Sequence, residues 1–243
     1  MPGKEGKTGK YKRVLLKISG EALQSANHTS PIDAETVDRI ATELSALNKK
    51  GTQIGVVIGA GNFFRGVSHT QLGIDRVTTD QMGMVSTVLN ALVLRSAIER
   101  AGSKATIFSA LPVNGIVEHY NRLTAIHALD SGFITIFAGG TGNPLVTTDS
   151  AASLRSIEIN ADILLKATNV DGVYSEDPKK NKNAKLLKKL NYHEVLKQEL
   201  GVMDLAAFSQ CRDYNMKIRV FNIHNKNAIT RIIAGEDEGS LIC

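Results

Sequence analysis

Cysteine, tryptophan and aromatic residues in general are scarce in this sequence. The 243 residues include two cysteines, Cys211 and Cys243, no tryptophan, and 5% aromatic residues. Two cysteines cannot form the disulfide framework of a small secreted protein, which favours a reducing compartment. The low aromatic content argues against a protein that binds its partners through exposed aromatic anchors.

Long apolar stretches are also missing. The first residues, MPGKEGKTGKYKR, lack the apolar core of a signal peptide. No unbroken apolar run approaches the roughly 20 residues that cross a bilayer. We therefore expect a soluble, cytoplasmic protein that has no membrane partner.

The formal net charge is +5, and part of the excess lies in residues 1–13 and 179–189. Such segments are commonly a frayed terminus and a solvated loop, and we expect residues 1–10 to form a disordered basic tail. The alternative is that they attract anionic ligands such as nucleotides. Nucleic acid is not expected as the primary partner, because the sequence has no zinc-finger spacing, RNP pattern or interleaved aromatic and basic residues.

Short apolar segments alternate with amphipathic segments along the chain. Apolar segments typical of buried parallel strands are 14–18, 53–58, 105–109, 133–137, 163–166 and 218–221. Helices are expected at 33–50, with Asp33 as N-cap, and at 80–101, 124–130, 149–159 and 203–215. Segment 80–101 is apolar on more than one face, so it lies in the core or at a subunit interface. The alternation predicts an α/β fold, a three-layer αβα sandwich with a mainly parallel central sheet.

Four glycine-containing or polar stretches follow expected strands, and they converge at one edge of a parallel sheet. They are KISG (17–20), GAGNFFRG (59–66), GGTGNP (139–144) and KATNVDGVYSEDP (166–178). Glycine allows a backbone to approach an anion closely. Lys17 and Lys166 end their strands, where a buried ammonium needs an anionic partner, although either lysine could instead leave the sheet at an edge. No stretch matches the Walker A motif, and Phe64 replaces the last glycine of a dinucleotide motif.

These motifs together resemble the amino acid kinase family, and within it the bacterial members that transfer the γ-phosphoryl group of ATP to UMP. The resemblance runs from about Tyr11 to the end, through LLKISGEALQ, GVVIGAGNFFRG, TDQMGM, GTGNPLVTTDSAA, KATNVDGVYSEDP and MDLAAF. It implies one carbamate kinase-like domain over 11–243, with an acceptor-binding part at about 11–165 and an ATP-binding part at about 166–243. It also implies a homo-oligomer, a hexamer built as a trimer of dimers.

The resemblance implies catalytic roles for Lys17, Lys166, Asp149 and Arg65. The lysines and the planar Arg65 guanidinium would neutralise phosphate charge, and Asp149 would hold the lysines, although it could also be a helix N-cap. The implied ATP-binding residues are Lys17, Ile18, Ser19, Gly20, Gly61, Arg65, Thr168, Tyr174 and Asp177, of which Tyr174 could equally be a packing residue.

A second implied set binds UMP. Its members are Ala60, Asp80, Thr141, Gly142, Asn143, Pro144, Leu145, Val146, Thr147 and Thr148. Asp80 could accept hydrogen bonds from the ribose diol or could cap a helix, and the sequence leaves both readings open. Ala60 falls where the family commonly has glycine, and we expect the UMP contact there to survive through the backbone.

The chemistry of the acceptor bears on what else the site needs. The second pKa of a nucleoside monophosphate is about 6, so the attacking phosphate is already largely dianionic and needs no general base. Mg²⁺ is expected with ATP, held mainly by phosphates and water rather than by dedicated protein ligands. Residues 25–31 lack the glycines that many relatives carry in a segment linked to GTP activation, which puts that activation in doubt. Feedback inhibition by UTP is expected.

Two other functions remain open from the sequence. One is a family relative that phosphorylates a carboxylate or carbamate, which would have less use for Asp80 and TGNPLVTT. The other is a nucleotide sensor without catalysis, which could lose Lys17, Lys166 or Asp149, yet all three are present.

Overall fold

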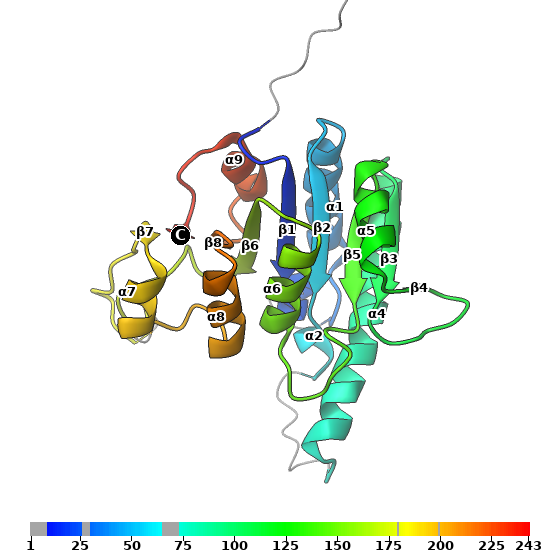
Figure 1. Cartoon of the computed structure of the whole chain (residues 1–243), viewed down its shortest axis with the longest axis horizontal. Helices are drawn as coiled ribbons and strands as arrows, with labels where there is room; N and C mark the ends of the chain where they lie inside the picture. The colour runs from blue at the N-terminus through cyan, green and yellow to red at the C-terminus, as the bar shows by residue number, and fades with distance from the viewer. Residues whose placement is uncertain (1–8, 26–29, 65–72, 179, 199) are drawn as a thin grey trace, which may run out of the picture.

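The computed structural model describes residues 9–25, 30–64, 73–178, 180–198 and 200–243, and within these residues nine strands form one sheet with helices on both faces (Figure 1). The strands are β1 Arg13–Ile18, β2 Gln53–Ile58, β3 Ala105–Ser109, β4 Glu118–His119, β5 Ile134–Ala138, β6 Ile163–Thr168, β7 Lys189–Leu190, β8 Ile218–Asn222 and β9 Ser240–Ile242. The helices are α1 Ala34–Asn48, α2 Gly61–Phe64, α4 Arg76–Arg100, α5 Arg122–Asp130, α6 Thr148–Glu158, α7 Tyr192–Lys197, α8 Leu205–Asp213 and α9 Ala228–Ala234. The predicted three-layer α/β sandwich is confirmed.

The order of the strands changes direction at β1. The strand order is β4-β3-β5-β2-β1-β6-β8-β9-β7. Strands β8 and β9 pair in antiparallel orientation, and the other neighbouring strands of the described sheet are parallel. The chain builds β2 to β5 on one side of β1 and then passes through α6 to β6 on the other side. Ligands of open α/β sheets bind outside the carboxyl ends of the strands at such a switch point.

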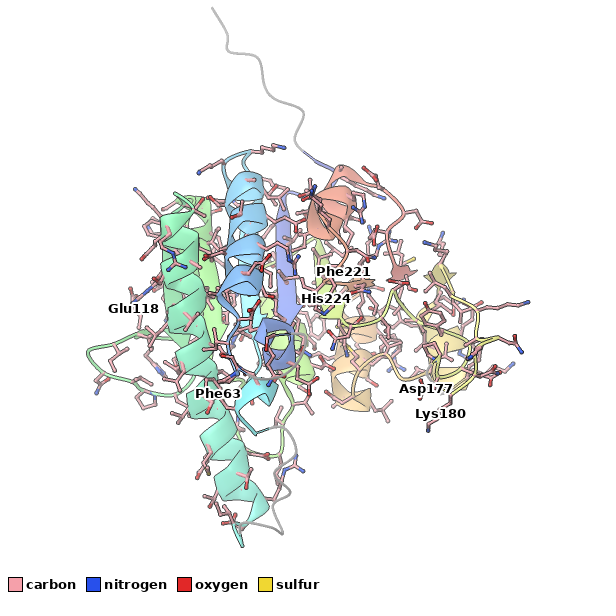
Figure 2. The ribbon with its side chains drawn as sticks, turned by 180° about the vertical axis from the view of Figure 1, so that it is seen from behind. Phe63, Glu118, Asp177, Lys180, Phe221 and His224 are labelled. Carbon is pink, nitrogen blue, oxygen red and sulfur yellow. The ribbon has the colours of Figure 1, made fainter. Side chains whose placement is uncertain are left out.

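The pleat of the strands decides which layer each side chain joins, because successive residues face opposite sides. Leu16 and Ile18 belong to an apolar cluster with α1, α4 and α9, whereas Leu15 and Leu164 belong to a cluster with α5, α6 and α8. Figure 2 shows the face that α1 and α4 cover. Lys17 follows Leu15 by two residues and Lys166 follows Leu164 by two, so both lysines leave the sheet on the α6 face. They are also register partners on adjacent strands.

The first predicted helix is confirmed together with its cap. Asp33 accepts a hydrogen bond from the Thr36 N–H at 2.9 Å, and α1 ends at Asn48, shortly before Gly51 with φ of 93°. A side-chain acceptor at the N-cap satisfies one of the free N–H groups that begin a helix.

The long helix α4 differs from its prediction in two ways. It begins at Arg76 rather than Asp80, because Asp75 is the N-cap and accepts from the Thr78 N–H at 3.0 Å. By length and composition, with mean hydropathy 1.2 over 18 residues, it could cross a membrane, which the sequence reading did not expect. Half of that window is buried in the structure, where α4 packs on α1, β3 and β5 as a core helix of a globular domain does. Its N-terminal turns extend past the edge of the sheet (Figure 1).

Candidate active site

Lys17, Lys166 and Asp149 meet at the carboxyl edge of the sheet. The Lys17 Nζ lies 3.0 Å from Asp149 Oδ1, and the Lys166 Nζ lies 2.6 Å from Asp149 Oδ2. The three side chains are 12% to 14% exposed, and Lys166 also donates to the carbonyl of Val202. One carboxylate therefore bridges two ammonium groups, which leaves a net positive charge facing the crevice.

The electrostatics of this bridged lysine pair follow from burial and proximity. Burial alone would raise the pKa of Asp149, but the charges of Lys17 and Lys166 outweigh it and hold that pKa below its ordinary value. Burial lowers the pKa of Lys166, the charge of Asp149 opposes this, and the charge of Lys17 adds to the lowering. A carboxylate with a lowered pKa that already binds two cations is a poor proton acceptor. Asp149 is thus suited to placing the lysines, and it is not the N-cap of α6, which is Thr147.

The backbone conformation of the turn after β5 accounts for the glycines in it. Gly139, Gly140 and Gly142 have φ of 74°, 58° and 84°, in the left-handed region that glycine adopts without strain. A Cβ at Gly139 would lie 3.0 Å from the backbone nitrogens of Ala110 and Leu111, so the turn also packs too closely for a side chain. Leu145, with φ of 66°, adopts the same region without being glycine.

A cavity of about 400 Å³ lies between this turn, the turn after β2 and the N-terminal half of α4. Seven residues with predicted nucleotide contacts line it: Ala60, Gly61, Asp80, Asn143, Val146, Thr147 and Thr148. Thr141, Gly142, Pro144 and Leu145 belong to the same turn but not to the lining. The remaining lining residues, not predicted from the sequence, are Arg76, Thr79, Gly83, Met84, Thr87 and Gly140. Those on α4 recur every three or four residues, which is the spacing of one helix face.

Asp80 connects α4 to the turn after β5. Its Oδ1 accepts from the Arg76 Nε at 2.8 Å, and its Oδ2 accepts from the Leu145 N–H at 2.8 Å. The alternative that Asp80 caps a helix is wrong, because Asp75 is the cap. Asp80 holds the Leu145 backbone and lines the cavity of about 400 Å³.

A second cavity, of about 480 Å³, lies over β6 and β8 and is lined by one of the two lysines, Lys166. Lys166, Thr168, Tyr174 and Asp177 line it, together with Val170, Gly172, Val173, Ser175, Glu176, Pro178, Gln198, Leu200, Gly201, Val202 and Val220. Burial and the nearby Asp171 raise the pKa of Tyr174, so its hydroxyl stays protonated as a donor. Asp177 and Glu118 lie toward opposite ends of the molecule in Figure 2.

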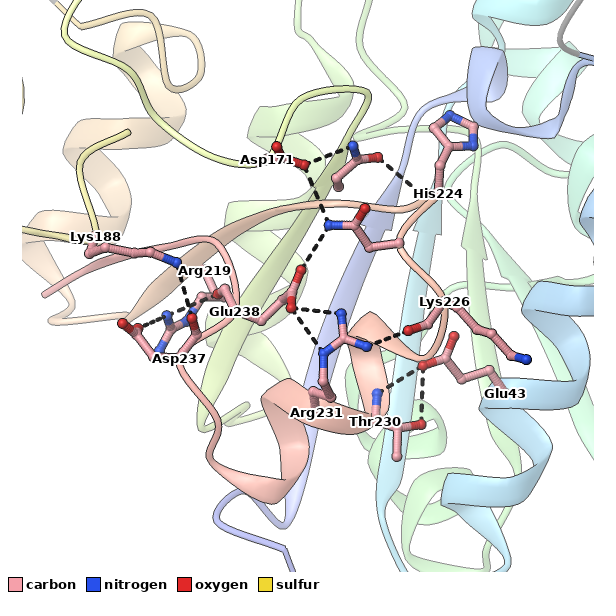
Figure 3. A network of polar contacts seen from close by, with 12 residues as sticks. Glu43, Asp171, Lys188, Arg219, His224, Lys226, Thr230, Arg231, Asp237 and Glu238 are labelled. Carbon is pink, nitrogen blue, oxygen red and sulfur yellow. Dashed lines mark hydrogen bonds and ion pairs between the residues drawn. The ribbon is translucent and has the colours of Figure 1, made fainter. Parts of the chain in front are cut away.

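Polar contacts hold the turn that forms one wall of this second cavity. Asp171 accepts from the amides of Asn222 at 3.0 Å and Asn225 at 3.4 Å, and Asn225 also donates to Glu238 Oε1 at 3.0 Å. Glu238 in turn pairs with Arg231 of α9 at 2.7 Å. Figure 3 shows this series of contacts, which ties the Asp171 turn to α9 and to the segment before β9.

Asp204 is a site residue that the sequence reading missed. It caps α8 by accepting from the Ala207 N–H at 2.9 Å, and it accepts from the hydroxyl of Thr147 and from the Ser150 Oγ at 3.2 Å. Thr147 is itself the N-cap of α6. Asp204 therefore joins the starts of two helices beside Asp149. The motif MDLAAF contains it, and an aspartate directly before a helical segment was the available signal.

Several sequence predictions concern the backbone or lie outside the described residues. Ile18 is buried and its carbonyl accepts from the Gly59 N–H at 2.9 Å, and a Cβ on Gly20 would lie 2.6 Å from the Gly61 nitrogen. Ser19, between them, is half-buried. Arg65 lies outside the described residues, as do residues 1–8 and 26–29. Within the described residues no group of three or more His, Cys, Asp or Glu side chains has the arrangement of a metal site.

A family model described as the amino acid kinase family matches residues 12–222. The chain belongs to the amino acid kinase family. It is 56% identical to the uridylate kinase of Coxiella burnetii over 96% of this chain and 95% of that protein. It is 54% identical to the uridylate kinase of Yersinia pestis strain Pestoides F, with 96% of each covered.

Solved structures of this family agree with the fold. The UMP kinase from Bacillus anthracis superposes with a TM-score of 0.92 at 42% identity, covering 96% of each chain. The UMP kinase from Ureaplasma parvum superposes with a TM-score of 0.90 at 32% identity, covering 96% of this chain and 99% of that one. The shared fold therefore spans the bridged lysine pair and both cavities.

Proposed function

We propose that this amino acid kinase transfers the γ-phosphoryl group of ATP to UMP, giving UDP and ADP. The observation that carries the proposal is the bridged lysine pair in a chain more than half identical to uridylate kinases: Lys166 lines one cavity, and Thr148, which precedes Asp149, lines the other. Both cavity volumes fall within the range of pockets that hold small molecules. The reaction would supply pyrimidine nucleotides in the cytoplasm.

The proposed mechanism depends on charge neutralisation and positioning. UMP occupies the cavity of about 400 Å³ and ATP the cavity of about 480 Å³, so the phosphates meet at Lys17 and Lys166. The ammonium groups and the backbone N–H groups near Gly20 and Gly61 stabilise the charge that spreads over the transferring group. The division into an acceptor part at 11–165 and an ATP part at 166–243 follows the two sides of the switch point.

The proposed phosphoryl transfer needs no general base. The UMP phosphate is already largely dianionic near pH 7, since its second pKa is about 6. Asp149, at the centre of the crevice, has a lowered pKa and holds both lysines. Asp149 holds the ammonium groups of Lys17 and Lys166 side by side, so that both can contact the phosphates when the two nucleotides bind.

Mg²⁺ fits this site as a companion of ATP. Held with ATP, it would neutralise part of the charge on the phosphates. Both oxygens of Asp149 face lysines, and Asp204 accepts from Thr147, Ser150 and Ala207, so these two carboxylates are occupied by protein partners. The phosphates and water are therefore expected to supply most of the metal ligands.

The acceptor-side cavity favours a nucleotide over a small acid. A volume of about 400 Å³ far exceeds what a carbamate or an amino acid carboxylate needs. Each Asp80 oxygen accepts one hydrogen bond from the protein and keeps a second lone pair that suits a ribose diol. A coupled assay with ATP, Mg²⁺ and a panel of UMP, CMP, AMP, glutamate, aspartate and carbamate tests this. We expect turnover with UMP. Turnover of an acid but not of UMP would refute the proposal, and nucleotide binding without any turnover would identify a sensor.

Assembly and regulation are further parts of the proposal. Val77, Val85 and Leu89 on α4 are 40%, 53% and 48% exposed, which supports a subunit interface on that helix and the expected hexamer. UTP is proposed as a feedback inhibitor that occupies the UMP site, while the lack of glycine in residues 25–31 puts activation by GTP in doubt. Mass measurement in solution and titration of UTP and GTP into the assay test these points.

A further inference from the structure

A reciprocal amide pair is buried beneath the predicted phosphate-binding turns. Asn90 on α4 is 0% exposed and Asn62 on α2 is 6% exposed. The Asn62 Nδ2 donates to Asn90 Oδ1 at 2.9 Å, and the Asn90 Nδ2 donates to Asn62 Oδ1 at 2.8 Å. The second proton of each amide is also used, because Asn90 donates to the Gly59 carbonyl at 2.7 Å and Asn62 donates to the Pro31 carbonyl at 2.9 Å. Every N–H of both amides therefore has an acceptor.

This amide pair fixes two glycine turns against each other. Gly59 belongs to the turn after β2, and its carbonyl is held directly by Asn90. Gly20 belongs to the turn after β1 and packs on the other side, where an added Cβ would lie 2.3 Å from Asn62 Oδ1. The backbone of Gly20 therefore packs directly against the side-chain amide of Asn62.

Thr87 makes the equivalent contact with the third glycine turn. It precedes Asn90 by three residues, so the two side chains lie on the same face of α4. Its Oγ1 accepts from the Gly139 N–H at 2.7 Å and donates to the Met84 carbonyl at 2.6 Å. Thr87 is 4% exposed, and it lines the acceptor-side cavity.

We propose that Asn90, with its partner Asn62, and Thr87 are positioning residues that set the three glycine turns against one another through α4. This inference rests on the proposed function, since the turns are those that would hold ATP phosphates and UMP. Asn90 and Asn62 set where the backbone N–H groups of the first two turns point toward the transferring group. Thr87 fixes the position of the Gly139 turn relative to the bound UMP. The amide pair should therefore affect mainly kcat, and Thr87 mainly the KM for UMP.

The variant Asn90→Asp tests the amide pair with almost no change in volume. A carboxylate cannot donate to the Gly59 carbonyl or to Asn62 Oδ1, so the turns shift apart. We expect kcat to fall at least ~10-fold, because small misplacements of groups around a reacting centre have effects of up to about 100-fold. The KM for UMP should also rise, but by a smaller factor than kcat falls, because Ala60 and Gly61 of the second turn line the acceptor-side cavity. Asn62→Asp should reproduce this pattern.

Ser45→Ala is the control for a lost buried contact between α1, which carries Ser45, and the C-terminal end of α4. The Ser45 hydroxyl is 2% exposed and donates to the Ala101 carbonyl at 2.9 Å, at the end of α4 remote from the turns. We expect its kcat to equal that of the unmodified chain. If Asn90→Asp keeps kcat within about 3-fold, or loses no more than Ser45→Ala does, the amide pair is only a core contact and the proposal fails.

Thr87→Val and Thr87→Ser test the second contact. Valine keeps the shape but leaves the buried Gly139 N–H without an acceptor, and we expect the KM for UMP to rise at least ~5-fold with kcat little changed. Serine keeps the acceptor and should restore the KM. Ser86→Ala is the control, because the Ser86 hydroxyl donates only within its own helix, to the Met82 carbonyl at 2.9 Å. Equal KM values for Thr87→Val and Ser86→Ala would overturn the assignment.

Hydrogen exchange separates this inference from the proposed function. The Gly139 amide should exchange faster in Thr87→Val than in Ser86→Ala or Thr87→Ser, whether or not the chain phosphorylates UMP. Unchanged Gly139 exchange in Thr87→Val would reject the positioning role. Failure of the unmodified chain to turn over UMP would instead reject the function, while the exchange result would still decide the positioning of the turn.

Discussion

The substitution Asp149→Asn removes the charge that bridges two ammonium groups while keeping the size of the side chain. In the structure the two nitrogen–oxygen distances are 3.0 Å and 2.6 Å, and the three side chains are 14% exposed or less. The variant leaves Lys17 and Lys166 side by side without the carboxylate that bridges them. We expect both the free energy of unfolding and kcat to fall.

The size of the stability effect follows from these distances. At an effective dielectric constant near 20, each pair attracts by roughly 5–6 kcal/mol before desolvation offsets most of it. Removing one partner of a buried pair destabilises a protein by about 3–5 kcal/mol, and partial exposure places this case near the lower value. A loss of about 3 kcal/mol lowers Tm by roughly 6–12 °C in a chain of this length. A role limited to the helix N-terminus would be worth only about 0.3–1 kcal/mol.

The substitution should lower kcat and also shift the pH dependence of kcat/KM. We expect kcat to fall at least ~100-fold, as when a preorganised charge partner is lost from an active site. The pKa of Lys166 is already lowered by burial, and the charge of Asp149 opposes that lowering. Without this charge the lysine loses its proton at still lower pH, so the alkaline limb of kcat/KM for ATP moves toward neutral pH.

Calorimetry and a coupled assay across pH measure both effects. Asp130→Asn is the control, because Asp130 pairs with Arg13 at 2.8 Å at the surface and is 54% exposed. That substitution should change stability by less than about 1 kcal/mol. An Asp149→Asn protein with kcat within about 3-fold of the unmodified chain and an unchanged alkaline limb would refute the reasoning.

Three further substitutions test other parts of the site. Lys166→Ala should lower kcat at least ~100-fold, and near-normal turnover would show that this lysine does not act on the transferring group. Asp80→Asn should raise the KM for UMP and leave the KM for ATP unchanged, whereas a change in the ATP constant alone would contradict the ribose assignment. Asp204→Asn weakens the acceptor for Thr147 and the cap of α8, so we expect a loss of about 1–2 kcal/mol in thermal unfolding and a raised KM for UMP. Unchanged values for both would show that Asp204 does not connect the two helices.

The central strands could be predicted from the sequence because they are continuous apolar runs that end at glycine or polar residues. The predicted segments 53–58 and 105–109 have the bounds of β2 and β3. The lysine pair could also be anticipated, since residues at the ends of neighbouring parallel strands converge. Edge elements escaped prediction, because β7 and β9 have two and three residues and gain their structure from pairing with each other and with β8.

The parts of the site that the sequence did not reveal depend on tertiary approach. Asp75 and Asp80 are both followed by polar residues, and only the hydrogen bond to Thr78 shows which one begins α4. Arg76 and Thr87 reach the acceptor-side cavity because the turns after β2 and β5 pack against α4. Nothing in the local sequence of a helix specifies which of its polar residues will meet another segment.

A crystal structure with UMP and a non-hydrolysable ATP analogue bound together is the most direct test of the account. We predict the two nucleotides end to end, with UMP against Asp80 and the Gly139 turn, and with the ammonium groups of Lys17 and Lys166 on the phosphates between them. Nucleotides that bind elsewhere, or phosphates that do not contact either lysine, would contradict it.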